Sequence, residues 1–175
     1  MKKSKALWIT QTAVFLALLV VVQFFTASLG QQLVTGSLVN YILIISVMTC
    51  GLGSGSIVAC VSPVLAKLLG IGPLWEIVPF IMLGNFALVL LWNLSKKLPF
   101  NNDVVNYGVG TVLGAVGKSA VLYFGVVKFM VPLLALPEQK AATISATFAL
   151  PQLFAALIGG VVAIITLPLL KKIIK

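Results

Sequence analysis

The sequence predicts an all-α integral membrane protein, a compact bundle of six transmembrane helices, from three observations. Hydrophobic residues make up 61% of the 175 residues and charged residues only 9%, whereas soluble domains contain about 25% charged residues. The apolar residues lie in long runs, and a helix needs about 20 residues to cross a bilayer. Most of the lysines lie at the ends of these runs, as is typical of membrane proteins.

The apolar runs give six expected spans within a single transmembrane domain, residues 1–175. The first run exceeds the apolar core of a signal peptide, about 7–15 residues, so we expect it to remain as a span. The run GLGSG at 51–55 predicts a tight turn or a close contact between helices. Pro63 and Pro151 predict kinks. The expected spans cover residues 6–28, 38–50, 56–69, 74–94, 104–131 and 141–170.

The distribution of lysines predicts that both termini are cytoplasmic. Six spans place the two termini on one side of the membrane, and eight of the twelve lysines then fall on that side. An excess of lysine marks the cytoplasmic face of membrane proteins. The two groups are Lys2, Lys3, Lys5, Lys96, Lys97, Lys171, Lys172 and Lys175 on that side, and Lys67, Lys128 and Lys140 near the other.

The composition excludes several functional classes. The chain has no histidine, and all of its basic residues are lysines. Metal sites built on histidine are therefore excluded, as is catalysis by a Ser/His or Cys/His pair. Without histidine or a paired acid dyad there is no general acid–base constellation, so we expect no enzyme. We also expect no nucleic-acid partner, because the lysines form no basic patch. Cys50 and Cys60 are interpreted as small core residues.

Lys118 lies at the centre of the fifth span and is the main candidate for a functional residue. A lysine at the middle of a bilayer costs about 3 kcal/mol on insertion scales, so it should face a protein interior or a watery cavity. Gly110, Gly114 and Gly117 lie on one face of the same helix, and small residues at that spacing allow a second helix to pack closely. The alternative is a structural lysine, paired with a carboxylate or with backbone carbonyls.

Two amides are expected at the depth of Lys118. Asn85 and Gln152 lie on the neighbouring spans, and together with the lysine they offer many donors as well as carbonyl acceptors. Such a set suits a small polar ligand with ring nitrogens, hydroxyls or a carboxylate. Alternatively, Asn85 and Gln152 bond to each other across the helices.

Further candidate contacts lie nearer the outer face, among them Asn40 and Tyr41, which are expected at the outer end of the second span. Trp75 is alternatively an interfacial anchor, and Glu76 alternatively pairs with Lys67. The expected substrate-binding set is Asn40, Tyr41, Trp75, Glu76, Asn85, Lys118, Tyr123 and Gln152.

Three motifs give the chain a resemblance to a known family. Ala13 and Ala17 form an AxxxA motif in the first span. The fourth span contains the run PFIMLGN, which ends at Asn85, and the sixth contains Pro151-Gln152 followed by Gly159-Gly160. Together with the size and number of spans, these motifs resemble the S components of energy-coupling factor (ECF) transporters, which bind substrate in bacterial vitamin importers.

The resemblance implies high-affinity binding and uptake of a small water-soluble vitamin or precursor across the bacterial plasma membrane. The energy would come from two ATPase subunits and one transmembrane coupling subunit, so this chain would need no cofactor. Ala13 and Ala17 would dock on the coupling subunit. The segment 30–37, with Gln31, Gln32, Thr35 and Gly36, would be a loop that acts as the lid of the site, and the S component would topple in the membrane to release its ligand.

The one-ring polar character of the site favours a pyridoxine-type or hydroxymethylpyrimidine-type ligand. The alternative function is a self-sufficient secondary transporter or channel. Such proteins usually use a proton or sodium relay at mid-depth, and the sequence places no carboxylate deep in a span. The sequence offers no acid–base pair of the kind that an intramembrane enzyme would need. A purely structural membrane adaptor would not need three polar residues at one depth.

Overall fold

The computed structural model describes residues 5–27, 30–72 and 74–173, and every regular element in these ranges is helical. Lys2, Lys3 and Lys175, and the expected end of the first span at residue 28, lie outside the described residues. The long elements are α1 (Lys5–Ala27), α2 (Gln32–Cys50), α3 (Leu52–Leu68), α4 (Val78–Ser95), α5 (Asp103–Leu122), α7 (Glu138–Phe148) and α8 (Leu150–Ile173). The short elements are the 3₁₀ turn η1 (Trp75–Ile77), the π-helical η2 (Tyr123–Met130) and the single turn α6 (Val131–Leu133).

Five helical stretches of the described chain are long and apolar enough to cross a membrane, and α3 is a sixth, shorter apolar helix of 17 residues. The expected start of the second span, at residue 38, is wrong, because α2 already begins at Gln32. The third span also begins earlier than expected, at Leu52. Polar residues join the start of α2 because the hydroxyls of Thr35 and Ser37 donate to the carbonyls of Gln31 and Leu33, one turn back.

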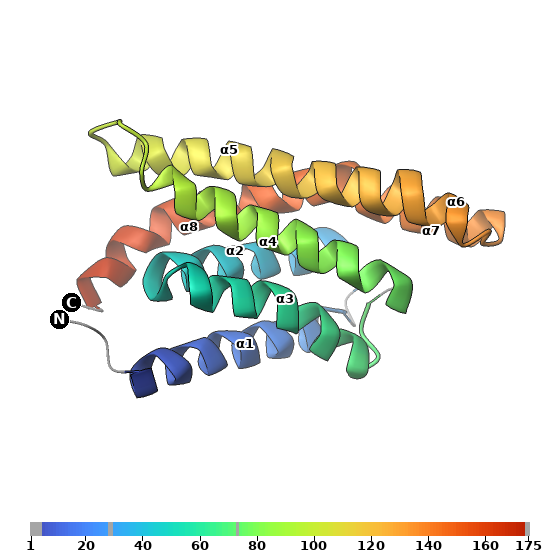
Figure 1. Ribbon diagram of the computed structural model, residues 1–175, viewed down its shortest axis with the longest axis horizontal. Coiled ribbons are helices and arrows are strands. Elements are labelled where there is room, and N and C mark those ends of the chain that lie inside the picture. The colour runs from blue at the N-terminus through green and yellow to red at the C-terminus, as the bar shows by residue number, and fades with distance from the viewer. Residues whose placement is uncertain (1–4, 28–29, 73, 174–175) are drawn as a thin grey trace.

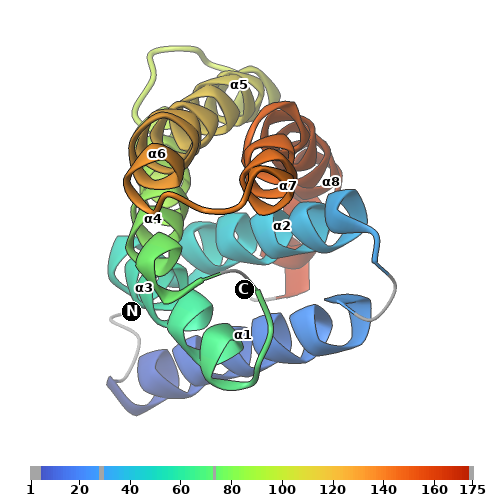
Figure 2. The same ribbon diagram turned by 90° about the vertical axis from the view of Figure 1, so that its right-hand side faces the viewer.

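The long helices run roughly side by side in one bundle (Figure 1). Helix α2 lies at its centre and packs against α1, α3, α4 and α8, while α5 packs against α4 and α8. Helix α1 lies at the edge of the bundle (Figure 2), in contact with α2 and α3. Helix α1 begins and α8 ends at the same end of the bundle (Figure 1), which we call the proximal end. We call the opposite end, where α2 and α4 begin, the distal end.

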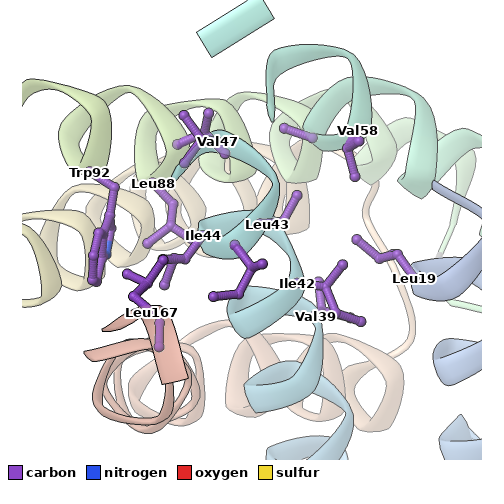
Figure 3. Packing of buried hydrophobic residues seen from close by; sticks show 14 of the residues in the cluster. Leu19, Val39, Ile42, Leu43, Ile44, Val47, Val58, Leu88, Trp92 and Leu167 are labelled. Carbon is purple, nitrogen blue, oxygen red and sulfur yellow. The ribbon is translucent and has the colours of Figure 1, made fainter. Parts of the chain in front are cut away.

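The main hydrophobic core fills the middle of the bundle and its proximal half. It joins α2, α4 and α8 through residues such as Leu43, Val47, Leu88, Trp92 and Leu167, none of which is exposed (Figure 3). A smaller cluster at the distal end joins η1, α5, η2 and α7. Its buried members are Ile77, Leu122, Val126 and Phe148.

The glycine face of α5 packs against α4, as the spacing predicts. A Cβ atom on Gly114 would lie 2.9 Å from the side chains of Leu88 and Trp92. A Cβ on Gly110 would lie 2.5 Å from Ser95 Oγ, and one on Gly117 would collide with a leucine of α4. The close approach of these two helices therefore depends on the missing side chains.

The helix breaks lie close to where the sequence places them. Gly51, with φ of 87°, separates α2 from α3, and only glycine adopts this conformation readily. The rest of the GLGSG run is helical, and a Cβ on Gly55 would lie 2.7 Å from Val47 Cβ, so the run is both a turn and a close contact. The last span is interrupted at Ala149, two residues before Pro151. Helix α3 continues through Pro63.

Candidate binding site at the distal end

A cavity of about 310 Å³ lies at the distal end of the bundle. Six long helices contribute to its wall: the end of α1, the first turns of α2, and parts of α3, α4, α5 and α8, with Phe148 of α7 beside them. Its volume is at the lower end of the range for small-molecule pockets, about 300–1,000 Å³. The polar residues on the wall are Gln23, Thr26, Gln31, Gln32, Thr35, Asn85, Lys118 and Gln152.

Lys118 is held on this wall by two asparagines. Its ammonium donates to Asn40 Oδ1 at 2.5 Å and to Asn85 Oδ1 at 2.7 Å. The lysine side chain is only 4% exposed, and both asparagines are buried. A lysine ammonium has three N–H donors, so two are used within the chain and the third remains for a molecule in the cavity.

The three residues of this cluster, which we call the Lys118 triad, come from different helices. Asn40 lies in α2, Asn85 in α4 and Lys118 in α5. The expectation that Asn40 lies at the outer end of its span is wrong, because α2 begins at Gln32. Eight residues of helix place Asn40 about 12 Å below that start, at a rise of about 1.5 Å per residue. The longer helix thus brings Asn40 to the depth of Lys118.

The triad contains a buried cation without an acidic partner. The chain has only three acidic residues, Glu76, Asp103 and Glu138, and all three are exposed and absent from the cavity wall. The acceptors of Lys118 within the described residues are neutral amide oxygens. The site therefore has a positive charge that the surrounding protein does not neutralise.

The amide groups around the triad are partly satisfied. Asn85 Nδ2 donates to the Ala59 carbonyl at 3.4 Å, and Gln152 Nε2 donates to the Thr147 carbonyl at 3.3 Å, across the break between α7 and α8. Asn85 and Gln152 therefore share the cavity wall but bond to other groups, not to each other. Asn40 Nδ2 is buried and has no partner in the part of the chain that the structure describes.

The segment 30–37 lies at the cavity, but it is not the loop that the sequence suggests. Gln32, Thr35 and Gly36 belong to the first turns of α2, and Gln31 immediately precedes the helix. These residues, with Gly30, form one side of the cavity wall. Any lid built from them therefore includes helical backbone.

Four predicted contact residues lie away from the cavity wall. Tyr41 packs against the main core, and Trp75 and Glu76 are exposed in η1. The Tyr123 ring lies 5.5 Å from the ammonium of Lys128. Five residues of helix turn Tyr123 by about 140° from Lys118, at about 3.6 residues per turn. These four side chains do not line the distal cavity.

Two polar residues of the wall are not among the residues expected from the sequence: Gln23 and Thr26, at the end of α1. Gln23 Oε1 is buried without a hydrogen-bond partner among the described residues. The available signal was a glutamine within a long apolar run, since a polar side chain in a span tends to face the bundle interior or a cavity. On another face of α1, Ala13 and Ala17 are exposed one turn apart.

The family comparison agrees with this membrane bundle and its distal cavity. The model of the family described as "ECF transporter, substrate-specific component" matches residues 8–170. The chain belongs to this family. It is thus an S component, a multi-pass membrane protein that binds substrate in vitamin-type uptake. No curated protein and no solved structure shows significant similarity to it.

Proposed function

We propose that this S component binds a small water-soluble vitamin or vitamin precursor in the distal cavity with high affinity and delivers it into the cell. The observation that carries the proposal is the Lys118 triad, a buried cation with one N–H left over on the wall of a cavity of about 310 Å³. A buried polar group that is incompletely paired in the empty protein gains an interaction when a ligand enters.

The distribution of lysines supports an outward-facing cavity in the bacterial plasma membrane. Lys5, Lys97 and Lys172 are exposed at the proximal end, with Lys96 beside them. Lys96 donates to the Val47 carbonyl near the end of α2. The excess of lysine at this end favours cytoplasmic termini, and the cavity at the opposite end then receives its ligand from outside.

Energy for transport is proposed to come from separate subunits, two ATPases and one transmembrane coupling protein. The family to which the chain belongs supports this arrangement. The proposed docking surface is the exposed face of α1 with Ala13 and Ala17, where small side chains allow a partner helix to approach closely. Val14 and Leu18 form a second exposed pair one residue further along. Substituting this pair by tryptophan is the matched control for the same substitution of Ala13 and Ala17.

The end of α1 and the first turns of α2 are proposed to act as the lid. Gly30 has φ of 65°, which gives this junction a conformation that other residues rarely adopt. Gln31, Gln32 and Thr35 lie on the wall beside it, so a movement of this junction would change access to the cavity.

The test is binding and uptake by the purified chain in lipid vesicles, with and without the coupling and ATPase subunits. Small molecules that co-purify with the chain are identified by mass spectrometry and used as radiolabelled substrates. We expect binding by the chain alone but uptake only with the partners and ATP. Uptake by the chain alone would instead establish the self-sufficient transporter.

The matched variants for this test are Lys118→Met and Lys128→Met. Both remove a lysine from the continuous helical stretch of α5 and η2, but Lys128 is exposed and lies away from the cavity wall. We expect Lys118→Met to bind at least tenfold more weakly, since a hydrogen bond to a charged group contributes about 1.5–3 kcal/mol. Lys128→Met should bind like the parent. Equal binding by both variants would place the site elsewhere.

A further inference from the structure

We propose that the ligand of this S component is a small monocarboxylate, and that its carboxylate binds the ammonium of Lys118. This inference rests on the proposed function, because it names the chemical class of ligand that the distal cavity accepts. It follows from the charge balance of the site, from the number of cations available and from the apolar surface beside them.

The charge balance of the site favours an anion. Lys118 is 4% exposed and bonds to two neutral amide oxygens. Isolated charges are strongly disfavoured in a low-dielectric interior, and buried charges are normally paired. The chain's own acids are all exposed and absent from the wall. A carboxylate on the ligand would supply the missing charge and accept the third N–H of the lysine.

The triad is arranged to present that N–H. Asn40 Oδ1 and Asn85 Oδ1 fix the ammonium from α2 and α4, so the side chain does not have to be ordered when the ligand arrives. Pre-organised groups of this kind favour binding because they reduce its entropic cost. The first turn of α2 also lies on the wall, and its N-cap residue makes no side-chain cap. The positive end of that helix adds to the attraction for an anion.

The number of cations favours a monoanion over a phosphate. Lys118 is the only lysine on the described wall of the cavity, and the chain contains no arginine. Phosphate carries a charge of about −1.5 to −2 and three acceptor oxygens, more than one N–H can satisfy, and arginine is over-represented where phosphate is bound. One ammonium with one remaining N–H matches a single carboxylate.

The rest of the wall indicates the body of the ligand. Ile81, Leu122 and Phe148 are apolar surface in the same cavity as the lysine, whereas Gln23 and Gln32 belong to the lid side. The carboxylate is therefore attached to a small, partly apolar body with a polar group at its other end. A neutral pyridine or pyrimidine vitamin, which the sequence alone favours, would accept a hydrogen bond but leave the charge of the lysine unbalanced.

The experiment compares each acid with a neutral analogue on the purified full-length chain. Compounds released by denaturing the protein are treated with an amine and a carbodiimide, which tag carboxylates, and are then identified by mass spectrometry. The released compound and its primary amide are titrated calorimetrically. Nicotinate with nicotinamide and pantothenate with panthenol serve as ready-made pairs. The proteins are the parent, Lys118→Met, Asn40→Asp and Gln152→Leu.

Asn40→Asp is the sharpest variant, because it keeps the shape of the side chain and places a carboxylate on the lysine from within the protein. That carboxylate competes with the ligand's own. We expect the acid to bind the parent at least tenfold more tightly than its amide. The preference should fall below threefold in Lys118→Met and in Asn40→Asp. Gln152→Leu, which changes no charge, should weaken the acid and the amide equally.

The outcomes separate this inference from the proposed function. A tagged compound whose preference over its amide disappears in the two charge variants supports both. An untagged compound, equal binding of acid and amide, or a preference that persists in Asn40→Asp overturns the carboxylate assignment and leaves the proposed function standing. If no compound is released and no probe binds the parent, the proposed function fails, and this inference fails with it. Asn40→Asp also covers the case in which Lys118→Met does not fold.

Discussion

Replacing Asn40 by leucine tests whether the Lys118 triad stabilises the empty protein. Asn40→Leu keeps the branching of the side chain and its number of heavy atoms, but it removes one of the two acceptors of the lysine. Hydrogen bonds to charged groups contribute about 1.5–3 kcal/mol. A chain of this size loses about 2–4 °C in Tm per kcal/mol. We therefore expect Tm to fall by roughly 3–12 °C, the product of those two ranges.

The double variant Asn40→Leu with Lys118→Met should recover stability that Asn40→Leu alone loses. The buried cation is removed together with one acceptor, and methionine keeps the length of the lysine stem. Replacing a buried polar or ionic pair by apolar groups of similar volume is often neutral or stabilising. The double variant should therefore melt above Asn40→Leu, so that the two substitutions couple by about 1.5–3 kcal/mol.

The measurement is thermal unfolding in detergent, followed by the fluorescence of the chain's three tryptophans. Lys128→Met is the control, since substitutions at exposed positions usually change stability by less than about 0.5 kcal/mol. The reasoning is refuted if Asn40→Leu melts like the parent. It is refuted equally if the double variant loses as much stability as the sum of the two single variants.

Three further predictions concern packing, docking and the lid. A Cβ on Gly159 would lie 2.7 Å from the Ser37 carbonyl oxygen, whereas one on Gly108 meets nothing within 4 Å. Gly159→Ala should therefore cost about 1–3 kcal/mol by overpacking, and Gly108→Ala should stabilise by about 0.5–1 kcal/mol, both measured by thermal unfolding. Changing Ala13 and Ala17 together to tryptophan should abolish co-purification with the transporter core but preserve ligand binding; survival of transport would place docking elsewhere. Residues 30–37 should exchange amide hydrogens more slowly when ligand is present, and equal exchange would remove the lid.

The helical class and most of the spans could be predicted from hydrophobicity, but the start of α2 could not. Its first turns carry Gln32, Thr35 and Ser37, which resemble a loop when the apolar runs alone are considered. In the structure, Thr35 and Ser37 satisfy their hydroxyls on the helix backbone. The expected start, at residue 38, lies six residues after the observed one, so the sequence places Asn40 at the outer end of the span instead of at the depth of Lys118.

The exceptional position of Lys118 could be predicted, because a lysine within an apolar run is costly unless it faces a cavity or partner. Its partners could not, because a search for a neutralising acid overlooks neutral amides. Depth along the helix alone places Tyr123 above Lys118, whereas the rotation of the helix turns its side chain by about 140° from the lysine. From Tyr123 onward the chain is also π-helical, which changes the facing of every later side chain up to Met130.

The helices are regular in the proximal half of the bundle and interrupted in the distal half, which contains the cavity. The main core joins α2, α4 and α8 in the middle and the proximal half, where the helices are regular. The distal half contains the smaller core, a 3₁₀ turn, a π-helical stretch and the break at Ala149. Such interruptions are tolerated at membrane depth where protein or a cavity covers the backbone, and regions with few buried contacts open at the lowest free energy.

The Lys118 triad lies where these two halves meet. It joins α2 and α4, which belong to the regular core, to α5 just before the π-helical stretch begins. A ligand that completes the lysine's interactions would therefore act on the base of the distal half as well as on the proposed lid. Coupling through a shared site of this kind requires the bound ligand to favour one arrangement of the distal helices over another. Lys118→Met should consequently reduce the ligand-induced protection of residues 30–37 even at ligand concentrations that saturate the variant. Full protection under those conditions would show that the lid responds to the ligand without the triad.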